Sequence, residues 1–272
     1  MLVEKSFDTG EVVLNYAEGS DNGPPLVLFP GLTRRWQSHP LQIIIPLSHR
    51  WHTYAVDNRG HGKSGRTPDK YRLIDYTRDA AAFVNNLSEP AAIFGHSLGG
   101  MILPGIANQA PDKVKAAIFG DPPLTNRSLR AWMTQELAVN WIRSLIEFKE
   151  SKPTLWEMAK KLGGVTPWNL EYARTIQSLD PSVPTVTLGV DEWFEGYDMY
   201  ELVKGIQCPV LLLQGDPSKF SAMTDEDVEY VKEHVSNVVH VRLDNVDHGL
   251  GLGEWRAEQV ISAMYFFLES LR

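Results

Sequence analysis

The 272-residue sequence has few of the features that mark several functional classes. It contains one cysteine, Cys208, which excludes an internal disulfide and fits a reducing compartment, so we expect a cytoplasmic protein. A net charge of -8, with no cluster of basic residues, argues against nucleic acid or an anionic membrane as a partner. No apolar run approaches the length of a membrane span, and the amino terminus lacks the apolar core of a signal peptide.

Motifs for bound groups are missing as well. The sequence has no Gly-rich phosphate-binding loop, no dinucleotide fingerprint and no cluster of metal ligands. We therefore expect no cofactor and no metal. Any chemistry would have to come from the side chains and backbone of the chain itself.

Short apolar runs alternate with segments of helical pattern along most of the chain. This order predicts an α/β fold, with a mostly parallel central sheet and helices on both faces. Residues 12–16 have the pattern of an early antiparallel strand. The expected parallel strands are 25–29, 51–56, 91–94, 114–119, 209–214 and 238–243, and the expected helices are 71–87, 98–109, 225–235 and a last one from about Trp255 to 271.

The alternation stops in the middle of the chain. Residues 123–205 contain no clear buried strand, only helix-like segments, and five of the eight tryptophans fall there. We interpret this stretch as a helical cap over the functional site, and residues 1–122 and 206–272 as the core. Some of these tryptophans would attach the cap to the core. As residues of a substrate pocket for an apolar or aromatic molecule we predict Trp132, Trp156 and Trp193.

One short motif suggests nucleophilic chemistry. The apolar run at 91–94 ends in Gly-His-Ser-Leu-Gly, and a helical segment follows. Small neighbours let a serine occupy a strained turn between strand and helix, which would present Ser97 as a nucleophile. The backbone N–H of Leu98, in the first turn of the helix, would then face an oxyanion. The N–H of Leu32, after the strand at 25–29, is the expected second oxyanion donor.

Together with Asp57-x-Arg59-Gly60-x-Gly62-x-Ser64 and a His248 in a late Gly-rich loop, these motifs resemble the α/β-hydrolase superfamily over nearly the whole chain. The resemblance implies a triad in the chain order nucleophile, acid, base. Ser97 would be the nucleophile and His248 the base. Two acids stay open: Asp121, after the strand at 114–119, is favoured, and Asp216, after the strand at 209–214, is the alternative.

Serine at the nucleophile position argues for an acyl-enzyme and against the carboxylate chemistry of haloalkane dehalogenases and epoxide hydrolases, which resemble this fold. Our first hypothesis is hydrolysis of a carboxylic ester or lactone of an apolar or aromatic small molecule. Amide, thioester or carbon–carbon bond hydrolysis would use the same triad. A second hypothesis, from a different functional class, is a ligand-sensing protein with little turnover.

Two adjacent arginines, Arg34 and Arg35, follow the expected oxyanion loop. They could bind a carboxylate of a substrate. The interpretation we favour from the sequence is that both are exposed to solvent.

Overall fold

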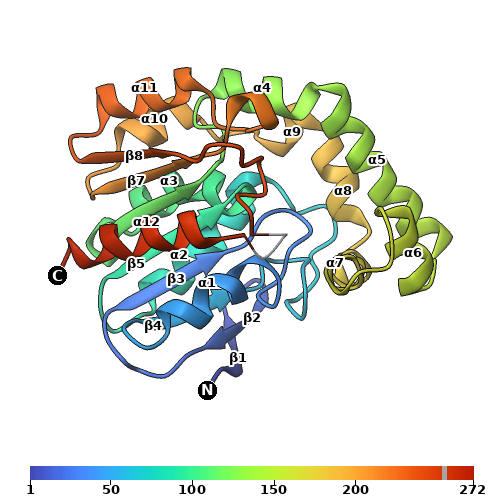
Figure 1. Ribbon diagram of the computed structural model, residues 1–272, viewed down its shortest axis with the longest axis horizontal. Coiled ribbons are helices and arrows are strands. Elements are labelled where there is room, and N and C mark those ends of the chain that lie inside the picture. The colour runs from blue at the N-terminus through green and yellow to red at the C-terminus, as the bar shows by residue number, and fades with distance from the viewer. Residues whose placement is uncertain (253–255) are drawn as a thin grey trace.

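The central feature of the fold is a sheet of eight strands in the order β1-β2-β4-β3-β5-β6-β7-β8 (Figure 1). The computed structural model describes residues 1–252 and 256–272. β1 and β2 pair antiparallel, β2 pairs antiparallel with β4, and all other pairs are parallel. The strands are β1 Val3–Asp8, β2 Val13–Glu18, β3 Pro25–Phe29, β4 His52–Val56, β5 Ala91–His96, β6 Val114–Gly120, β7 Val210–Gln214 and β8 Val238–Arg242.

The expected strands are confirmed, and one strand is added. Every residue of β3, β5 and β7 is buried, which is why each of them has a continuous apolar pattern in the sequence. β1 was not predicted, because it is an edge strand whose residues are almost all exposed. It therefore lacks the apolar pattern by which a strand is recognised.

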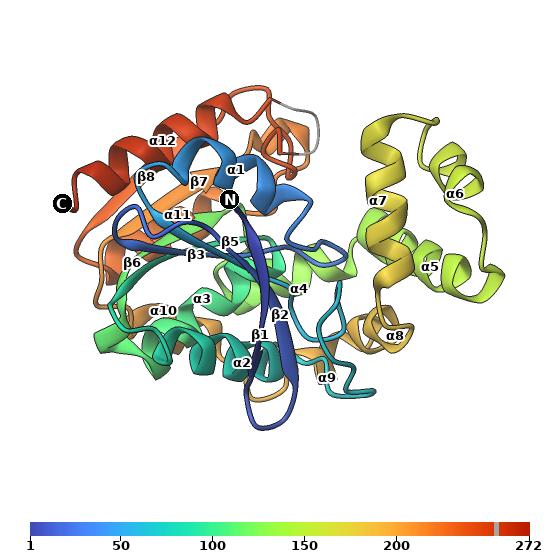
Figure 2. The same ribbon diagram turned by 90° about the horizontal axis from the view of Figure 1, so that it is seen from below.

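Helices cover both faces of the sheet, as expected for parallel strands joined by crossovers (Figure 2). On one face α1 (His39–Leu47) and α12 (Glu258–Glu269) pack in one apolar cluster. The other face is covered by α2 (Leu73–Asn85), α3 (Leu98–Gln109) and α11 (Asp225–His234). α1 was not predicted, and Trp255, the expected start of the last helix, lies outside the described residues. Two short 3₁₀ turns occur at Pro111–Lys113 and Pro217–Lys219.

The insertion between β6 and β7 contains helices and loops but no strand. α5 to α8 stand beside the sheet as a group, whereas α10 packs against α3 and α11 on one face of it (Figures 1 and 2). Threonine or aspartate side chains cap four of the helices in the insertion, at Thr125, Thr154, Thr166 and Asp198. The helices of the whole insertion are α4 Asn126–Thr134, α5 Glu136–Ser151, α6 Leu155–Lys161, α7 Pro167–Ser178, α8 Ser182–Leu188, α9 Val190–Trp193 and α10 Met199–Lys204.

Buried polar contacts join the insertion to the core. The amide of Asp180 donates to the carbonyl of Gly60 at 2.8 Å, and the indole N–H of Trp193 donates to the carbonyl of Tyr71 at 3.0 Å. Trp193 is thus one of the tryptophans that attach the helices to the sheet domain. Among the described residues, no helix has both the length and the apolarity that crossing a bilayer requires.

Candidate active site

Ser97 lies on the sharp turn between β5 and α3. Its backbone has φ 52° and ψ -118°, a strained conformation for a residue with a side chain. Close backbone packing holds the turn: a Cβ on Gly95 would come within 2.2 Å of the carbonyl oxygen of Gly99, and one on Gly99 within 2.0 Å of that of Phe29. Both positions therefore require glycine, and the strand and helix can approach closely enough to raise Ser97 out of the sheet edge.

A continuous chain of hydrogen bonds joins Ser97, His248 and Asp121. The Oγ of Ser97 lies 2.9 Å from Nε2 of His248, and Nδ1 of the same ring lies 2.8 Å from Oδ2 of Asp121. A carboxylate only accepts hydrogen bonds, so Nδ1 carries the proton and Nε2 is left to accept from the serine hydroxyl. The geometry therefore selects the imidazole tautomer that can take a proton from Ser97.

Asp121 is completely buried, and protein donors surround its carboxylate. Oδ1 accepts from the amide of Gly215 at 2.9 Å and from the hydroxyl of Ser221 at 2.6 Å, and Oδ2 accepts from the amide of Ala222 at 2.8 Å. These bonds fix the carboxylate in one orientation, with Oδ2 toward His248. Its partners follow β7, far away in the sequence.

The other candidate acid, Asp216, makes different contacts. Its carboxylate accepts from the amide of Ser218 at 2.9 Å and from that of Asn245 at 3.0 Å, so it caps a short turn. The hydroxyl of Ser218 also donates to it, at 2.7 Å, and this bond together with the two amide bonds lowers the pKa of Asp216 from the ordinary value. His248 contacts Asp121 and not Asp216.

The amides of Leu32 and Leu98 lie beside Ser97. Both residues line the same pocket as the serine, and a Cβ on Gly31 would be 3.3 Å from Cβ of Ser97. Within the described parts of the chain, neither amide donates to a protein acceptor. Leu98 begins α3, so its N–H also lies at the positive, amino-terminal end of the helix dipole.

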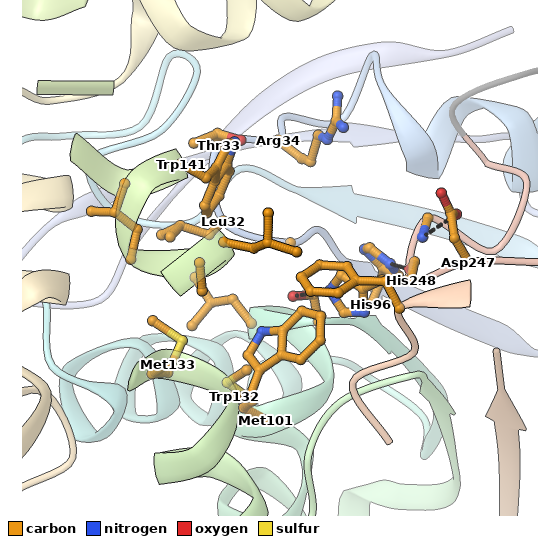
Figure 3. Close-up of a pocket in the computed structure, with 18 of the residues that line it drawn as sticks. Leu32, Thr33, Arg34, His96, Met101, Trp132, Met133, Trp141, Asp247 and His248 are labelled. Carbon is orange, nitrogen blue, oxygen red and sulfur yellow. Dashed lines mark hydrogen bonds between the residues drawn. The ribbon is translucent and has the colours of Figure 1, made fainter. Parts of the chain in front are cut away.

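Ser97 opens into a cavity of about 560 Å³ (Figure 3). One side of it, the core wall, comes from the loops of the sheet domain. The opposite side, the helical wall, consists mainly of apolar residues of the insertion. The core wall includes Gly31, Leu32, Thr33, Arg34, His96, Ser97, Leu98, Phe220, Asp247, His248 and Gly249, and the helical wall includes Trp132, Met133, Leu137, Ala138, Trp141, Ile142, Tyr172 and Trp193.

Residues 24–248 match the family model of the alpha/beta hydrolase fold. The chain belongs to this family. The 2-(acetamidomethylene)succinate hydrolase of Mesorhizobium japonicum is 34% identical over 121 residues, a match that spans 44% of this chain and 43% of the relative, so less than half of either is compared. The (E)-2-((N-methylformamido)methylene)succinate hydrolase of Acinetobacter baylyi is 25% identical over 91% of both chains.

Solved structures agree on the fold. A serine-to-alanine variant of the N-formylmaleamic acid deformylase of Pseudomonas putida S16 superposes with a TM-score of 0.80, at 18% identity, over 97% of this chain and all of that one. At this identity the likeness extends to the α/β-hydrolase fold and no further.

Two of the three tryptophans expected in the pocket of this α/β hydrolase lie there, and the third does not. Trp132 and Trp193 line it, and the Trp132 ring lies 4.8 Å from that of His248 (Figure 3). Trp156 is 60% exposed, because α6 turns Met158 and Ala159 toward its neighbouring helices and leaves the tryptophan outside. Trp141 takes the place expected for Trp156 and donates from its indole N–H to the hydroxyl of Tyr172 at 3.0 Å.

His96 is a neighbour of the base that was not predicted from the sequence. Its Nε2 donates to the backbone carbonyl of His248 at 2.7 Å, and the two rings lie 5.1 Å apart. Burial lowers the pKa of His96 to about 3, so it stays neutral beside the base. Its position next to Ser97 in the motif was the available signal. Among the described residues of this α/β hydrolase, no group of three His, Cys, Asp or Glu side chains could hold a metal ion.

Proposed function

We propose that this α/β hydrolase cleaves an acyl bond of a small molecule through an acyl-enzyme on Ser97. The observation that carries the proposal is the hydrogen-bonded chain from Asp121 through His248 to Ser97, open to an apolar cavity. A neutral imidazole bonded to a serine hydroxyl is a general base in position.

In the proposed first half-reaction, Nε2 of His248 takes the hydroxyl proton while Oγ of Ser97 attacks the carbonyl carbon of the substrate. The amides of Leu32 and Leu98 stabilise the oxyanion, and the carboxylate of Asp121 stabilises the imidazolium. His248 then gives its proton to the leaving group, and the scissile bond breaks. In the second half-reaction water, deprotonated by His248, attacks the acyl-enzyme, releases the acid and restores the serine.

The type of acyl bond is a finer question within this proposal. Esters and lactones were the sequence-based hypothesis. The two curated relatives are named for succinates with an acetamido or an N-methylformamido group, which favours an amide as the bond cleaved. The same two half-reactions would cleave esters, lactones and amides, since only the leaving group differs. The small molecules tested should therefore include all three bond types.

The experiment is intact-mass spectrometry after exposure to a small fluorophosphonate. We expect one adduct on the parent protein and none on Ser97→Ala, with labelling of His248→Ala slowed at least a hundredfold because the serine loses its base. An ester, lactone and amide panel then assigns the bond. Absence of an adduct on the parent protein would contradict the proposal and favour the ligand-sensing alternative.

A further inference from the structure

Arg34 lies in the core wall, two residues after Leu32, and its surroundings differ from the solvent expected for it. Its guanidinium carbon lies 4.0 Å from the ring centroid of Tyr172 and 5.2 Å from that of Trp168, both on α7. Nη1 is buried and has no hydrogen-bond partner among the described residues. The prediction of an exposed Arg34 is therefore wrong. Figure 3 shows the side chain extending from the loop that carries Leu32 and Thr33.

The neighbouring arginine, unlike Arg34, has a carboxylate in direct contact within the described residues. Arg35 donates to both carboxylate oxygens of Glu171, at 2.9 and 3.0 Å. The same glutamate is also within 3.9 Å of Arg174. Within the described residues, no carboxylate forms an ion pair with Arg34. Asp247, the other charged group among the described residues that line the pocket, accepts from the amide of Gly249 at 2.8 Å.

A partly buried guanidinium without an anion in contact is an unfavourable arrangement, and Glu171 attracts Arg34 without forming an ion pair with it. Arginine stays protonated in proteins, although burial here lowers its pKa from the ordinary value. The aromatic rings attract the cation through their faces, but they accept none of its N–H groups. What the planar fork matches best is a carboxylate, which takes two parallel hydrogen bonds from it.

We propose that Arg34 binds a carboxylate of the substrate, so that this enzyme acts on acyl compounds that carry an acid group as well as an apolar part. The inference rests on the proposed function, since it places the carboxylate on the molecule whose carbonyl Ser97 attacks. Arg34 and the oxyanion donor Leu32 belong to one short loop. The loop therefore holds the anion and the reacting carbonyl of one small molecule together, while the apolar part faces the helical wall.

Binding without turnover tests this separately from the proposed function. Ser97→Ala is titrated calorimetrically with 4-phenylbutanoate and with 4-phenylbutanamide, which have the same shape but differ in charge. We expect the acid to bind at least tenfold more tightly than the amide. In Ser97→Ala/Arg34→Gln the ratio of the acid affinity to the amide affinity should fall below threefold, because only the acid loses affinity. Arg34→Lys in the same Ser97→Ala background should recover part of the acid affinity. Ser97→Ala/Arg35→Gln, which breaks a pair already satisfied, is the matched control and should keep the preference.

Each outcome decides the question. Equal affinity for acid and amide, no binding of the acid at millimolar concentration, or a preference that survives Arg34→Gln contradicts the carboxylate site. Because the serine is absent from all these variants, a failure here leaves the fluorophosphonate result untouched, and a failed labelling leaves this result untouched. Arg34→Gln in the active enzyme adds a kinetic check: the loss should appear in KM, for an acidic ester and not for its neutral isostere.

Discussion

The two walls of the pocket are built in different ways. In the core wall and directly behind it, backbone packing and buried hydrogen bonds determine where each polar group lies, as at the strained turn of Ser97 and the enclosed carboxylate of Asp121 behind His248. In the helical wall, apolar side chains project from α4, α5, α7 and α9 and make few hydrogen bonds. Leu137 of this wall is still 65% exposed.

This difference separates reaction from recognition. Moving a reacting group by a fraction of an ångström breaks a hydrogen bond, so the positions in the core wall tolerate little change. An apolar contact is non-directional and depends mainly on the area that is buried. We therefore expect changes in the core wall to affect catalysis and folding strongly, and changes in the helical wall to alter affinity by small steps.

The largest effect should come from the acid of the triad. Asp121→Asn keeps the shape but removes the charge that holds the His248 tautomer, and we expect kcat to fall by about a thousandfold to ten-thousandfold. Asp216→Asn, at the exposed turn, should stay within about threefold. Steady-state kinetics on an activated ester, with circular dichroism to check the fold, measures both. The reverse ranking would contradict the assignment of Asp121.

The second test compares two glycines. Helix propensity alone predicts that Gly99→Ala stabilises the protein by about 1 kcal/mol. The new Cβ would instead meet the carbonyl oxygen of Phe29 at 2.0 Å, and we expect a net loss of about 3 kcal/mol or more. At Gly189 of the insertion the nearest atom, at 3.0 Å, belongs to the movable side chain of Glu192, so Gly189→Ala should change stability by under about 1 kcal/mol. Urea denaturation gives both values, and equal midpoints would show that the turn is less tightly packed than described.

The third test uses pH. Burial lowers the pKa of His61 from 6.5 to about 4 and that of His96 to about 3, and residues 123–205 contain no histidine. The unfolded chain binds protons more readily at both sites. These two groups therefore lower the free energy of unfolding as the pH falls from 6.5 toward 4, each by about 2–3 kcal/mol.

A variant isolates this contribution from that of the carboxylates. His61→Asn keeps a donor for the carbonyl of Arg59, which Nδ1 of His61 contacts at 2.8 Å. Between pH 6.5 and 5 its stability, measured by urea denaturation, should fall less steeply than that of the parent protein. Parallel curves for the two proteins would mean that His61 binds protons as readily in the folded protein as in the unfolded chain.

The smallest effect belongs to the helical wall. Trp141→Leu removes part of the apolar lining, and we expect KM to rise about fivefold with kcat little changed, because contact with substrate and transition state is lost alike. Trp156→Leu, outside the pocket, is the control and should leave KM unchanged. If Trp156→Leu raised KM and Trp141→Leu did not, the described orientation of α6 would be wrong.

Local patterns and long-range contacts differ in how well the sequence foretold them. The turn at Ser97 was predictable because strand, glycines and helix are contiguous. The strands β3, β5 and β7 were predictable because each is buried on both faces. β1 and α1 were missed, because an exposed edge strand and a helix with two prolines give weak patterns. The orientation of Trp156 was not predictable either, since it depends on which face of a short helix the neighbouring helices cover.

What the amino-acid sequence determined by itself is the α/β-hydrolase fold and the presence of a serine on a strained turn, because both follow from the order and composition of short segments. The partner of His248 and the state of Arg34 were decided only by the tertiary structure. Asp121 and Asp216 each follow a buried strand, and the sequence left both open; the loop of Ser221 and Ala222 encloses one of them. Likewise Arg34 and Arg35 are adjacent, but Glu171, more than a hundred residues later, pairs with only one of them. Electrostatic pairing depends on distance in space, and only the folded chain sets that distance.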